Sequence, residues 1–364
     1  MAGSQIDPGR AARAATDFLL AAQDAQGAWK DFLLPAGNSN VWVTGYVGEA
    51  LASLPAAEAR EAALGGWRFL EGVKSGAGGW SYNPTVPGDA DSTLWGLRLA
   101  EKVGRENSER ARAASEFLAS HVRESGGIAT YASAAPVRNF IGLPPLVTFR
   151  GWTQSHVCVT AAGAHLGAHR GAFRQYLLDR QSEDGRWAAY WWFDDEYATA
   201  EAVSALAAAE QTPADSDPRL APAIARGVDW ARRRSEALSA AEAGSAPAFA
   251  LAQSLRVLAR SRRPEEVRDT LAAGLRRLAE WQKPDGSWPG SARLRVPHPE
   301  AITPAANGSW TLWTRMPPGA PTLESILKNT FNIFSLDHYG VFTTATVLRA
   351  LWEISRLDGL AVRA

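Results

Sequence analysis

A short acidic segment, Asp89-Ala-Asp91-Ser92-Thr93, is the part of this sequence best suited to proton transfer. An aspartate enclosed by aromatic side chains is costly to ionise, so its pKa rises and it holds a proton at neutral pH. A carboxyl group in that state is a general acid. The structural alternative is an N-cap, because Asp, Ser and Thr often precede an apolar helix, and Asp89 suits that position.

A second acidic group, Asp194 and Asp195, opens a predicted helix. Carboxylates at that position favour the helix dipole, and the functional alternative is a Mg²⁺ clamp for a substrate diphosphate. Ala198 stands where a complete D-D-x-x-D pattern would have its last aspartate. We therefore assign no metal ligand and keep Asp194 and Asp195 as weak candidates.

Three further side chains are candidates for acid–base work beside Asp91. His156 and Tyr339, together with His338, could remove the final proton of a reaction or orient Asp91 through a hydrogen bond. A zinc site at His156 and Cys158 is disfavoured, because the remaining ligand candidates belong to the opposite side of the predicted ring. His156 and Tyr339 are therefore assigned to the substrate-binding set.

The elements that must position these residues follow from an internal repeat. The pattern Q-x-x-x-G-x-W ends at Trp29, Trp187 and Trp288, and weaker copies end at Trp80 and Ile128. A sixth, eroded copy is expected near residues 231–240. Each copy follows a helical pattern, and a second helix with a Thr and then a Leu seven residues later comes after it. The repeat predicts an all-α ring of six helical hairpins, with the glycine ending the first helix of each hairpin.

The Thr-to-Leu spacing also predicts which residues face the centre of the ring. The residue two positions before the Thr should lie at the same height in every repeat. These positions are Trp42, Asp91, Val157, Tyr197, Phe249 and Phe342. Aromatic faces stabilise a carbocation without offering a strong nucleophile, although aromatic residues at helical spacing also form ordinary cores. The expected substrate-binding residues are Trp42, Trp152, His156, Tyr197, Phe249, Phe342 and Tyr339.

The repeat resembles the QW repeat of squalene–hopene cyclases and class II diterpene cyclases over nearly the whole chain. The resemblance implies a single (α/α)6 toroid formed by residues 1–364. Two stretches break the period, at about residues 129–150 and 289–335. Such insertions in a toroid fall on loops, which either act as lids over a cavity or extend into solvent with no role.

The acidic segment resembles the D-x-D-D-T acid motif of class II cyclases, whose middle aspartate protonates an isoprenoid double bond or epoxide. The resemblance implies that Asp91 is this acid and that Asp89 is its carboxylate neighbour. Coupling between like charges would raise one of the two pKa values further. The sequence departs from the motif at Ser92, where the family has a second adjacent aspartate.

Composition excludes several other classes of function. The 364 residues include 38 Lys+Arg and 38 Asp+Glu, so the formal net charge of zero offers no electrostatic attraction for nucleic acid. The single cysteine, Cys158, excludes an internal disulfide and a multi-thiolate metal site. No stretch resembles a signal peptide or an apolar membrane span. We expect a cytoplasmic monomer or homodimer, with peripheral membrane contact left open.

The sequence therefore predicts a proton-initiated terpene or meroterpenoid cyclase that acts on an isoprenoid substrate with Asp91 as general acid. It would need no cofactor, and Mg²⁺ would enter only with a diphosphate substrate. Two alternatives stay open: a non-catalytic toroid that binds an isoprenoid or a partner, and a Mg²⁺-dependent prenyltransferase-like enzyme. The direction of the Asp91 side chain distinguishes the cyclase from the non-catalytic toroid. In the cyclase it points into the cavity, whereas a cap would accept hydrogen bonds from the backbone N–H groups of Leu94 and Trp95.

Overall fold

The structure is a computed structural model that describes residues 8–74, 78–167, 170–212, 217–242, 246–304, 308–314 and 331–357. Within these residues, most helices form six consecutive pairs. The pairs are α1 (Pro8–Ala22) with α2 (Val41–Ala52), α3 (Ala57–Gly72) with α4 (Ala90–Lys102), α5 (Glu109–Ala119) with α8 (Val157–Gly163), α9 (Arg170–Leu178) with α10 (Asp195–Glu210), α11 (Leu220–Ser239) with α12 (Ala248–Leu258), and α13 (Pro264–Trp281) with α15 (Val341–Ser355).

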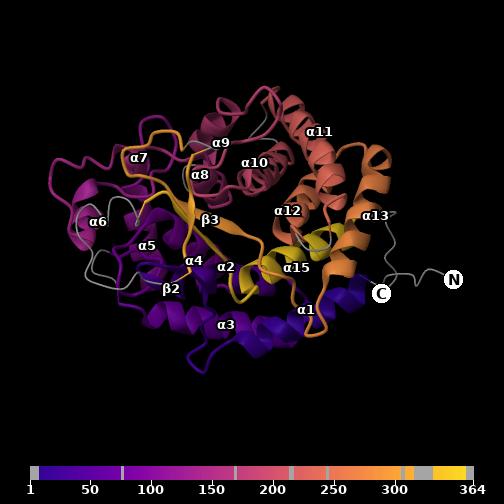
Figure 1. Ribbon diagram of the computed structural model, residues 1–364, viewed down its shortest axis with the longest axis horizontal. Coiled ribbons are helices and arrows are strands. Elements are labelled where there is room, and N and C mark those ends of the chain that lie inside the picture. Colours follow the sequence, from indigo (N-terminus) through magenta and orange to yellow (C-terminus); the bar gives the residue numbers. More distant parts are fainter. Residues whose placement is uncertain are drawn as a thin grey trace.

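The second helices of the pairs form a closed inner ring. α2 contacts α4, α4 contacts α8, α8 contacts α10, α10 contacts α12, α12 contacts α15, and α15 returns to α2. The first helices lie outside this ring, as α1, α3, α11 and α13 do in Figure 1. The all-α ring of helical hairpins expected from the repeat is confirmed. None of the helices in the described ranges is long and apolar enough to cross a membrane.

Hydrogen bonds at the turns explain why the repeat contains tryptophan, glutamine and threonine. In the first copy, the backbone N–H of Trp29 donates to Thr44 Oγ1 at 2.9 Å, and its indole Nε1 donates to the carbonyl of Leu19 at 2.7 Å. Gln23 Nε2 donates to the carbonyls of Gly27 and Ala62, so it joins its own turn to the next outer helix. Each copy thus satisfies buried polar groups while it fixes the angle of one hairpin.

The same pattern recurs around the ring. Trp80, Trp187 and Trp288 repeat both tryptophan hydrogen bonds. Gln282 Nε2 donates to the carbonyl of Ala11 at 2.9 Å. Because Gln282 follows the last outer helix and Ala11 lies in the first, this bond closes the ring.

Two details of the expected register are wrong. In the third repeat the backbone N–H of Ile128 donates to Thr160 Oγ1 at 2.8 Å, so Thr160 is the equivalent of the other threonines. The position two residues earlier is therefore Cys158 rather than Val157. The eroded copy expected at residues 231–240 is not a turn there, because α11 continues to Ser239.

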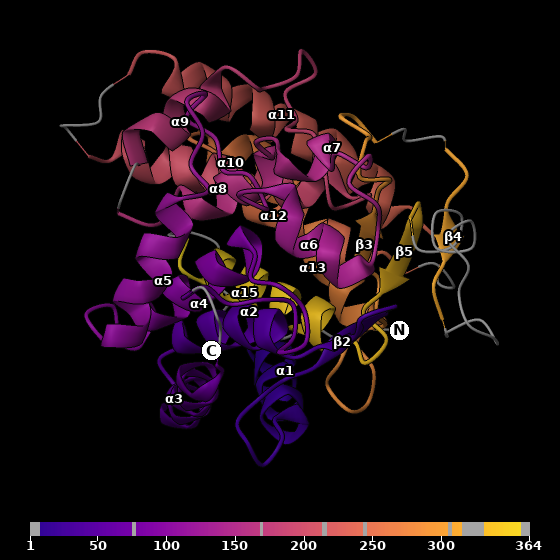
Figure 2. The ribbon, with the colours of Figure 1, turned by 90° about the vertical axis from the view of Figure 1, so that its left-hand side faces the viewer.

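Short strands and two small helices lie at one end of the ring. The strands are β1 (Asp31–Leu34), β2 (Gly37–Ser39), β3 (Arg293–Val296), β4 (Thr311–Leu312) and β5 (Ile333–Leu336), and the helices are α6 (Ala134–Ile141) and α7 (Arg150–Thr153). β1 and β2 are antiparallel, whereas β5 pairs antiparallel with β3 and parallel with β4. Figure 2 shows α6, β3 and β5 together on one side of the ring. Both insertions therefore contribute to this end.

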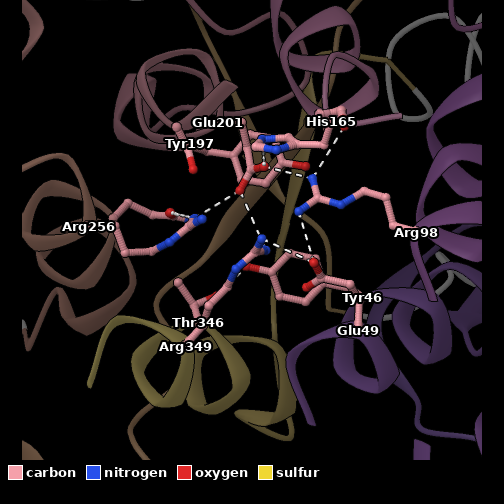
Figure 3. A network of polar contacts seen from close by, with 12 residues as sticks. Tyr46, Glu49, Arg98, His165, Tyr197, Glu201, Arg256, Thr346 and Arg349 are labelled. Carbon is pink, nitrogen blue, oxygen red and sulfur yellow. Dashed lines mark hydrogen bonds and ion pairs between the residues drawn. The ribbon is translucent and has the colours of Figure 1, made fainter. Parts of the chain in front are cut away.

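A layer of buried ion pairs crosses the centre of the ring (Figure 3). Glu201 accepts hydrogen bonds from Arg98 Nη1 at 2.7 Å and Arg256 Nη1 at 2.8 Å, and Arg349 Nη1 lies 3.6 Å away. Glu49 Oε1 accepts from Arg98 Nη2 and Arg349 Nη2. Four of these residues follow the predicted central positions by seven residues, which is about 10 Å along a helix. The inner helices thus carry an ionic layer two turns beyond the predicted site.

Candidate active site

A cavity of about 320 Å³ opens at the end of the ring that carries the strands. Its wall is mostly apolar and strongly aromatic. The aromatic lining residues are Trp42, Tyr82, Tyr131, Phe140, Trp152, Trp191, Trp313 and Phe331. The carboxyl groups that line it within the described residues are those of Asp89 and Asp91. Such a cavity would bind an apolar chain and bring it against an acid.

Asp91 lies in the first turn of α4 and lines the cavity. Its Oδ1 is buried and has no hydrogen-bond partner in the described part of the chain. Burial raises the pKa of Asp91 well above its usual value of 3.8, and the charges of Asp89 and Glu201 raise it further. Both effects favour the protonated form of the Asp91 carboxyl group.

Asp89 performs the structural role that the acidic segment also predicts. It is the N-cap of α4, and its Oδ1 accepts from the backbone N–H of Ser92 at 2.7 Å. Its Oδ2 accepts from Ser92 Oγ at 2.8 Å. Burial raises the pKa of Asp89 to about 6, although the two hydrogen bonds from Ser92 oppose the shift. The two interpretations of the segment thus apply to different residues, with Asp89 as the cap and Asp91 facing the cavity.

The predicted aromatic residues divide into two groups. Trp42 and Trp152 line the cavity. Tyr197, Phe249 and Phe342 are fully buried and pack deeper, around the ring of Trp192. The centroid of Trp192 lies 4.9 Å from Tyr197, 5.3 Å from Phe249 and 5.4 Å from Phe342. Trp192 therefore packs at the centre of these three rings, and like them it does not line the cavity.

His156 is connected to the cavity through Thr130. Its Nε2 lies 2.8 Å from the carbonyl of Gly151, so Nε2 carries the proton and Nδ1 accepts from Thr130 Oγ1 at 2.7 Å. Thr130, which lines the cavity, also accepts from the indole N–H of Trp191. Burial lowers the pKa of His156 to about 3, so the ring is neutral.

Tyr339, another acid–base candidate, lies away from the cavity. It is 50% exposed, and its backbone N–H donates to Asp31 Oδ1 at 3.0 Å. The structure thus brings Trp42, Asp89, Asp91 and Trp152 to one cavity and leaves Tyr339 at the surface.

The weak metal candidates are engaged by arginines. Asp194 Oδ1 accepts from Arg293 Nη2 at 2.6 Å. Asp195 accepts from the backbone N–H of Ala189 at 2.9 Å, and its Oδ2 lies 3.0 Å from Arg186 Nε. Neither carboxylate lines the cavity. In the described ranges no group of three or more His, Cys, Asp or Glu side chains could hold a metal ion.

Sequence reasoning missed a large part of the cavity wall, because described parts of both insertions contribute to it; residues 305–307 and 315–330 of the second insertion lie outside the described residues. Thr130, Tyr131, Val137, Phe140 and Ile141 come from the first insertion, and Leu294, Arg295, Val296, Trp313 and Phe331 come from the second. Val137, Phe140 and Ile141 have the i, i+3, i+4 spacing of one face of α6, whereas the cavity residues of the second insertion lie on short strands and loops without helical periodicity. The available signal was the length of the insertions, since long ordered loops of a ring tend to cover its open end.

Solved structures share this architecture. A variant of the type II terpene cyclase MstE from Scytonema, in complex with geranylgeranyl dihydroxybenzoate, is 36% identical over 96% of this chain and 97% of that chain, with a TM-score of 0.86. A protein from Actinoplanes is also 36% identical, over 96% of this chain and 100% of that chain, with a TM-score of 0.83. No protein-family model and no curated protein matches the chain.

A more distant structure shares the fold alone. It is ent-copalyl diphosphate synthase from Streptomyces platensis, 18% identical over 86% of this chain and 50% of that chain, with a TM-score of 0.54. The ring of helical pairs, the aromatic cavity and the carboxyl group of Asp91 place the protein in the class of helical-toroid enzymes. The similarity to the Scytonema enzyme then shows that the chain belongs to the type II terpene cyclase family. The expectation of an enzyme that cyclises an isoprenoid is confirmed.

Proposed function

We propose that this enzyme starts cyclisation by transferring the proton of Asp91 to an alkene of the bound isoprenoid. The observation that carries the proposal is a carboxyl group with an unpartnered, buried oxygen and a raised pKa in an aromatic cavity. Proton transfer forms a C–H bond and leaves a carbocation on the neighbouring carbon. Further double bonds attack this cation in turn, and loss of a proton ends the reaction, so the product has the mass of the substrate.

The aromatic wall protects and guides the cation. Trp42, Trp152 and Trp191 present ring faces or edges to the cavity, and ring faces attract positive charge through their quadrupole. The indole N–H of Trp152 donates to the carbonyl of Pro297 at 3.1 Å, and that of Trp191 donates to Thr130. These bonds hold the rings in place, so the cavity is organised before the charge forms.

Asp89 supports the acid in this proposal. It anchors the first turn of α4 through Ser92, and its negative charge raises the pKa of Asp91. Ser92 replaces the second aspartate of the acid motif and donates its hydroxyl to Asp89. The acid site of this chain is therefore a carboxyl group beside a serine-bound carboxyl neighbour.

The substrate we propose is a geranylgeranyl chain attached to an aromatic acid. The Scytonema relative is seen with geranylgeranyl dihydroxybenzoate as substrate and with merosterolic acid A as product. A variant of that enzyme in which one aspartate is replaced by asparagine is also seen with the substrate. Proton-initiated cyclisation of such a compound needs no cofactor, and Mg²⁺ would be required only for a diphosphate. A cytoplasmic location and a monomeric or homodimeric state are further proposals, based on composition.

The decisive experiment is incubation of the purified protein with geranylgeranyl dihydroxybenzoate, with Mg²⁺ or with EDTA. We expect an isomer of unchanged mass under both conditions and no detectable product with Asp91→Asn. Glu61→Gln is the matched control, because Glu61 is exposed and does not line the cavity. Equal turnover by Asp91→Asn would show that another group supplies the proton.

A further inference from the structure

Two arginines on strand β3 have opposite environments. Arg293 donates to Asp194 through Nη2 at 2.6 Å and through Nε at 3.2 Å, and it does not line the cavity. Arg295 is only 6% exposed and lines the cavity. Its guanidinium forms no ion pair with any Asp or Glu of the described residues. A buried cation without a counter-ion is costly, and its cost is recovered when an anion binds to it.

The guanidinium of Arg295 is held in a fixed orientation. Its Nε donates to the carbonyl of Tyr190 at 2.9 Å, and its Nη2 donates to the carbonyl of Ala189 at 2.6 Å. Its Cζ lies 5.3 Å from the ring centre of Phe193 and 5.6 Å from that of Trp310. These contacts occupy two of the nitrogens and leave Nη1 without an acceptor in the described part of the chain. A ligand would thus meet a preorganised donor.

The surroundings do not neutralise this charge. Burial lowers the pKa of Arg295, and the charge of Asp195 opposes that shift. Asp195 is itself paired with Arg186 Nε at 3.0 Å. A guanidinium keeps its proton in proteins, so Arg295 remains a cation in the cavity wall. It is the one Lys or Arg among the described residues that line the cavity.

We propose that Arg295 binds the anionic head group of the substrate, and that this group is a carboxylate. The inference rests on the proposed function, because it names the end of the substrate opposite the alkene that Asp91 protonates. One guanidinium matches the single charge of a carboxylate. A diphosphate carries more charge and would call for several cations or a metal ion. Arg295 is therefore a specificity-determining residue that sets which end of the isoprenoid faces the acid.

The test compares geranylgeranyl dihydroxybenzoic acid with its methyl ester, in wild-type protein and in Arg295→Gln. We expect the wild type to prefer the acid by about 10- to 100-fold in kcat/KM, as a charge-assisted hydrogen bond would provide. Arg295→Gln should lose this preference by lowering kcat/KM for the acid while the value for the ester changes little. Arg295→Lys should keep part of it, because the charge remains. Arg293→Gln, on the same strand, should leave the acid-to-ester ratio unchanged.

Binding measurements separate this inference from the proposed function. Titration calorimetry in an Asp91→Asn background measures affinity for the acid, the ester and geranylgeranyl diphosphate without turnover. Arg295-dependent binding of the acid, with no product from wild-type protein, would overturn the proposed function and support the inference. An acid-to-ester ratio that is the same with and without Arg295 would overturn the inference. So would an Arg295-dependent preference for the diphosphate over the acid.

Discussion

Asp91 and Glu201 are both carboxyl groups on inner helices, yet their pKa values are shifted in opposite directions. Asp91 has an unpartnered oxygen, and burial raises its pKa well above the usual value. Burial acts on Glu201 in the same direction, but Arg98, Arg256 and Arg349 outweigh it and hold the pKa of Glu201 well below the usual value. Burial alone therefore does not decide the charge of a carboxyl group, because the neighbours decide it.

The ring has two levels with different tasks: an ionic level, which contains Glu49, Glu201 and their arginines, and an aromatic level, which contains Asp91 and the cavity. At the ionic level, Glu49 and Glu201 join arginines from α4, α12 and α15, so the charges hold helices together across the centre. At the aromatic level, Asp91 is surrounded by rings that cannot stabilise its anion. Trp192 packs against Tyr197 and Phe342, and none of these three residues lines the cavity. Burial thus accompanies ion pairs at one level and a raised pKa of Asp91 at the other.

The largest expected effect is on catalysis at the aromatic level. Asp91→Asn should lower product formation by about 10²- to 10⁴-fold, because it removes the transferable proton. It should not lower the free energy of unfolding, since no hydrogen bond to Asp91 is lost and the cost of holding an ionisable carboxyl group at this site is removed. Activity assays and urea unfolding of the same preparation measure both. A loss of stability comparable to the loss of activity would contradict the separation of the two levels.

The ionic level should show the reverse. Glu201→Gln should destabilise the fold by about 3–5 kcal/mol, because it leaves the buried Arg98, Arg256 and Arg349 without their central counter-ion. Urea unfolding measures the change. The exposed pair of Arg68 and Glu61 provides the control, and Glu61→Gln should cost less than about 1 kcal/mol. Equal effects of the two substitutions would show that the ionic level does not support the ring.

The pH dependence of stability should have opposite signs at the two levels. The pKa of Asp89 is raised from 3.8 to about 6, so its contribution is present below pH 4 and is lost as the pH rises through 6. The pKa of Glu49 is lowered from 4.5 to about 2 by Arg349 and Arg98, which outweigh its burial. Its contribution is present above pH 4.5 and is lost as the pH falls toward 2. Each contribution is of the order of 3 kcal/mol.

Unfolding experiments between pH 3 and pH 7 resolve these two contributions. Asp89→Asn should remove the decline between about pH 4 and pH 6, while asparagine still caps α4. Glu49→Gln should remove the acid-side decline, although it also destabilises the fold at neutral pH by unpairing Arg98. An unchanged slope in Asp89→Asn would mean that Asp89 is ionised in the native protein throughout this range.

The smallest effect is expected at the boundary between the levels. Tyr46 stacks on Phe342 with ring centroids 3.9 Å apart, and its hydroxyl lies 2.7 Å from Thr346 Oγ1. Tyr46→Phe should cost about 1 kcal/mol, because Thr346 keeps its hydrogen bond to the carbonyl of Phe342. Thermal unfolding measures this cost, and product formation should stay at the wild-type rate. A change in the products would show that the hydroxyl group of Tyr46 influences the bound substrate.

The sequence predicted most of what is local and repeated. The tryptophan, glutamine and threonine of each turn bond within one hairpin or to the next one, so their spacing along the chain carries the ring. The acidic segment likewise lies on one turn of α4, and its two roles could be stated before the structure was known. Where the repeat had lost its residues, the prediction failed, as it did in placing Val157 instead of Cys158.

Tertiary structure decided which groups meet at the cavity. Arg295 and Trp192 can be read in the sequence, but their places in the fold cannot. Only the folded loops place Arg295 in the cavity wall and Trp192 against Phe249 at the centre of the ring. The reason is physical. A helix repeats its geometry every few residues and so encodes direction in spacing, whereas an irregular loop takes its direction from the surfaces it covers. Sequence alone therefore determined the ring and the place of Asp91 in it, and packing of distant segments determined the shape and charge of the space around Asp91.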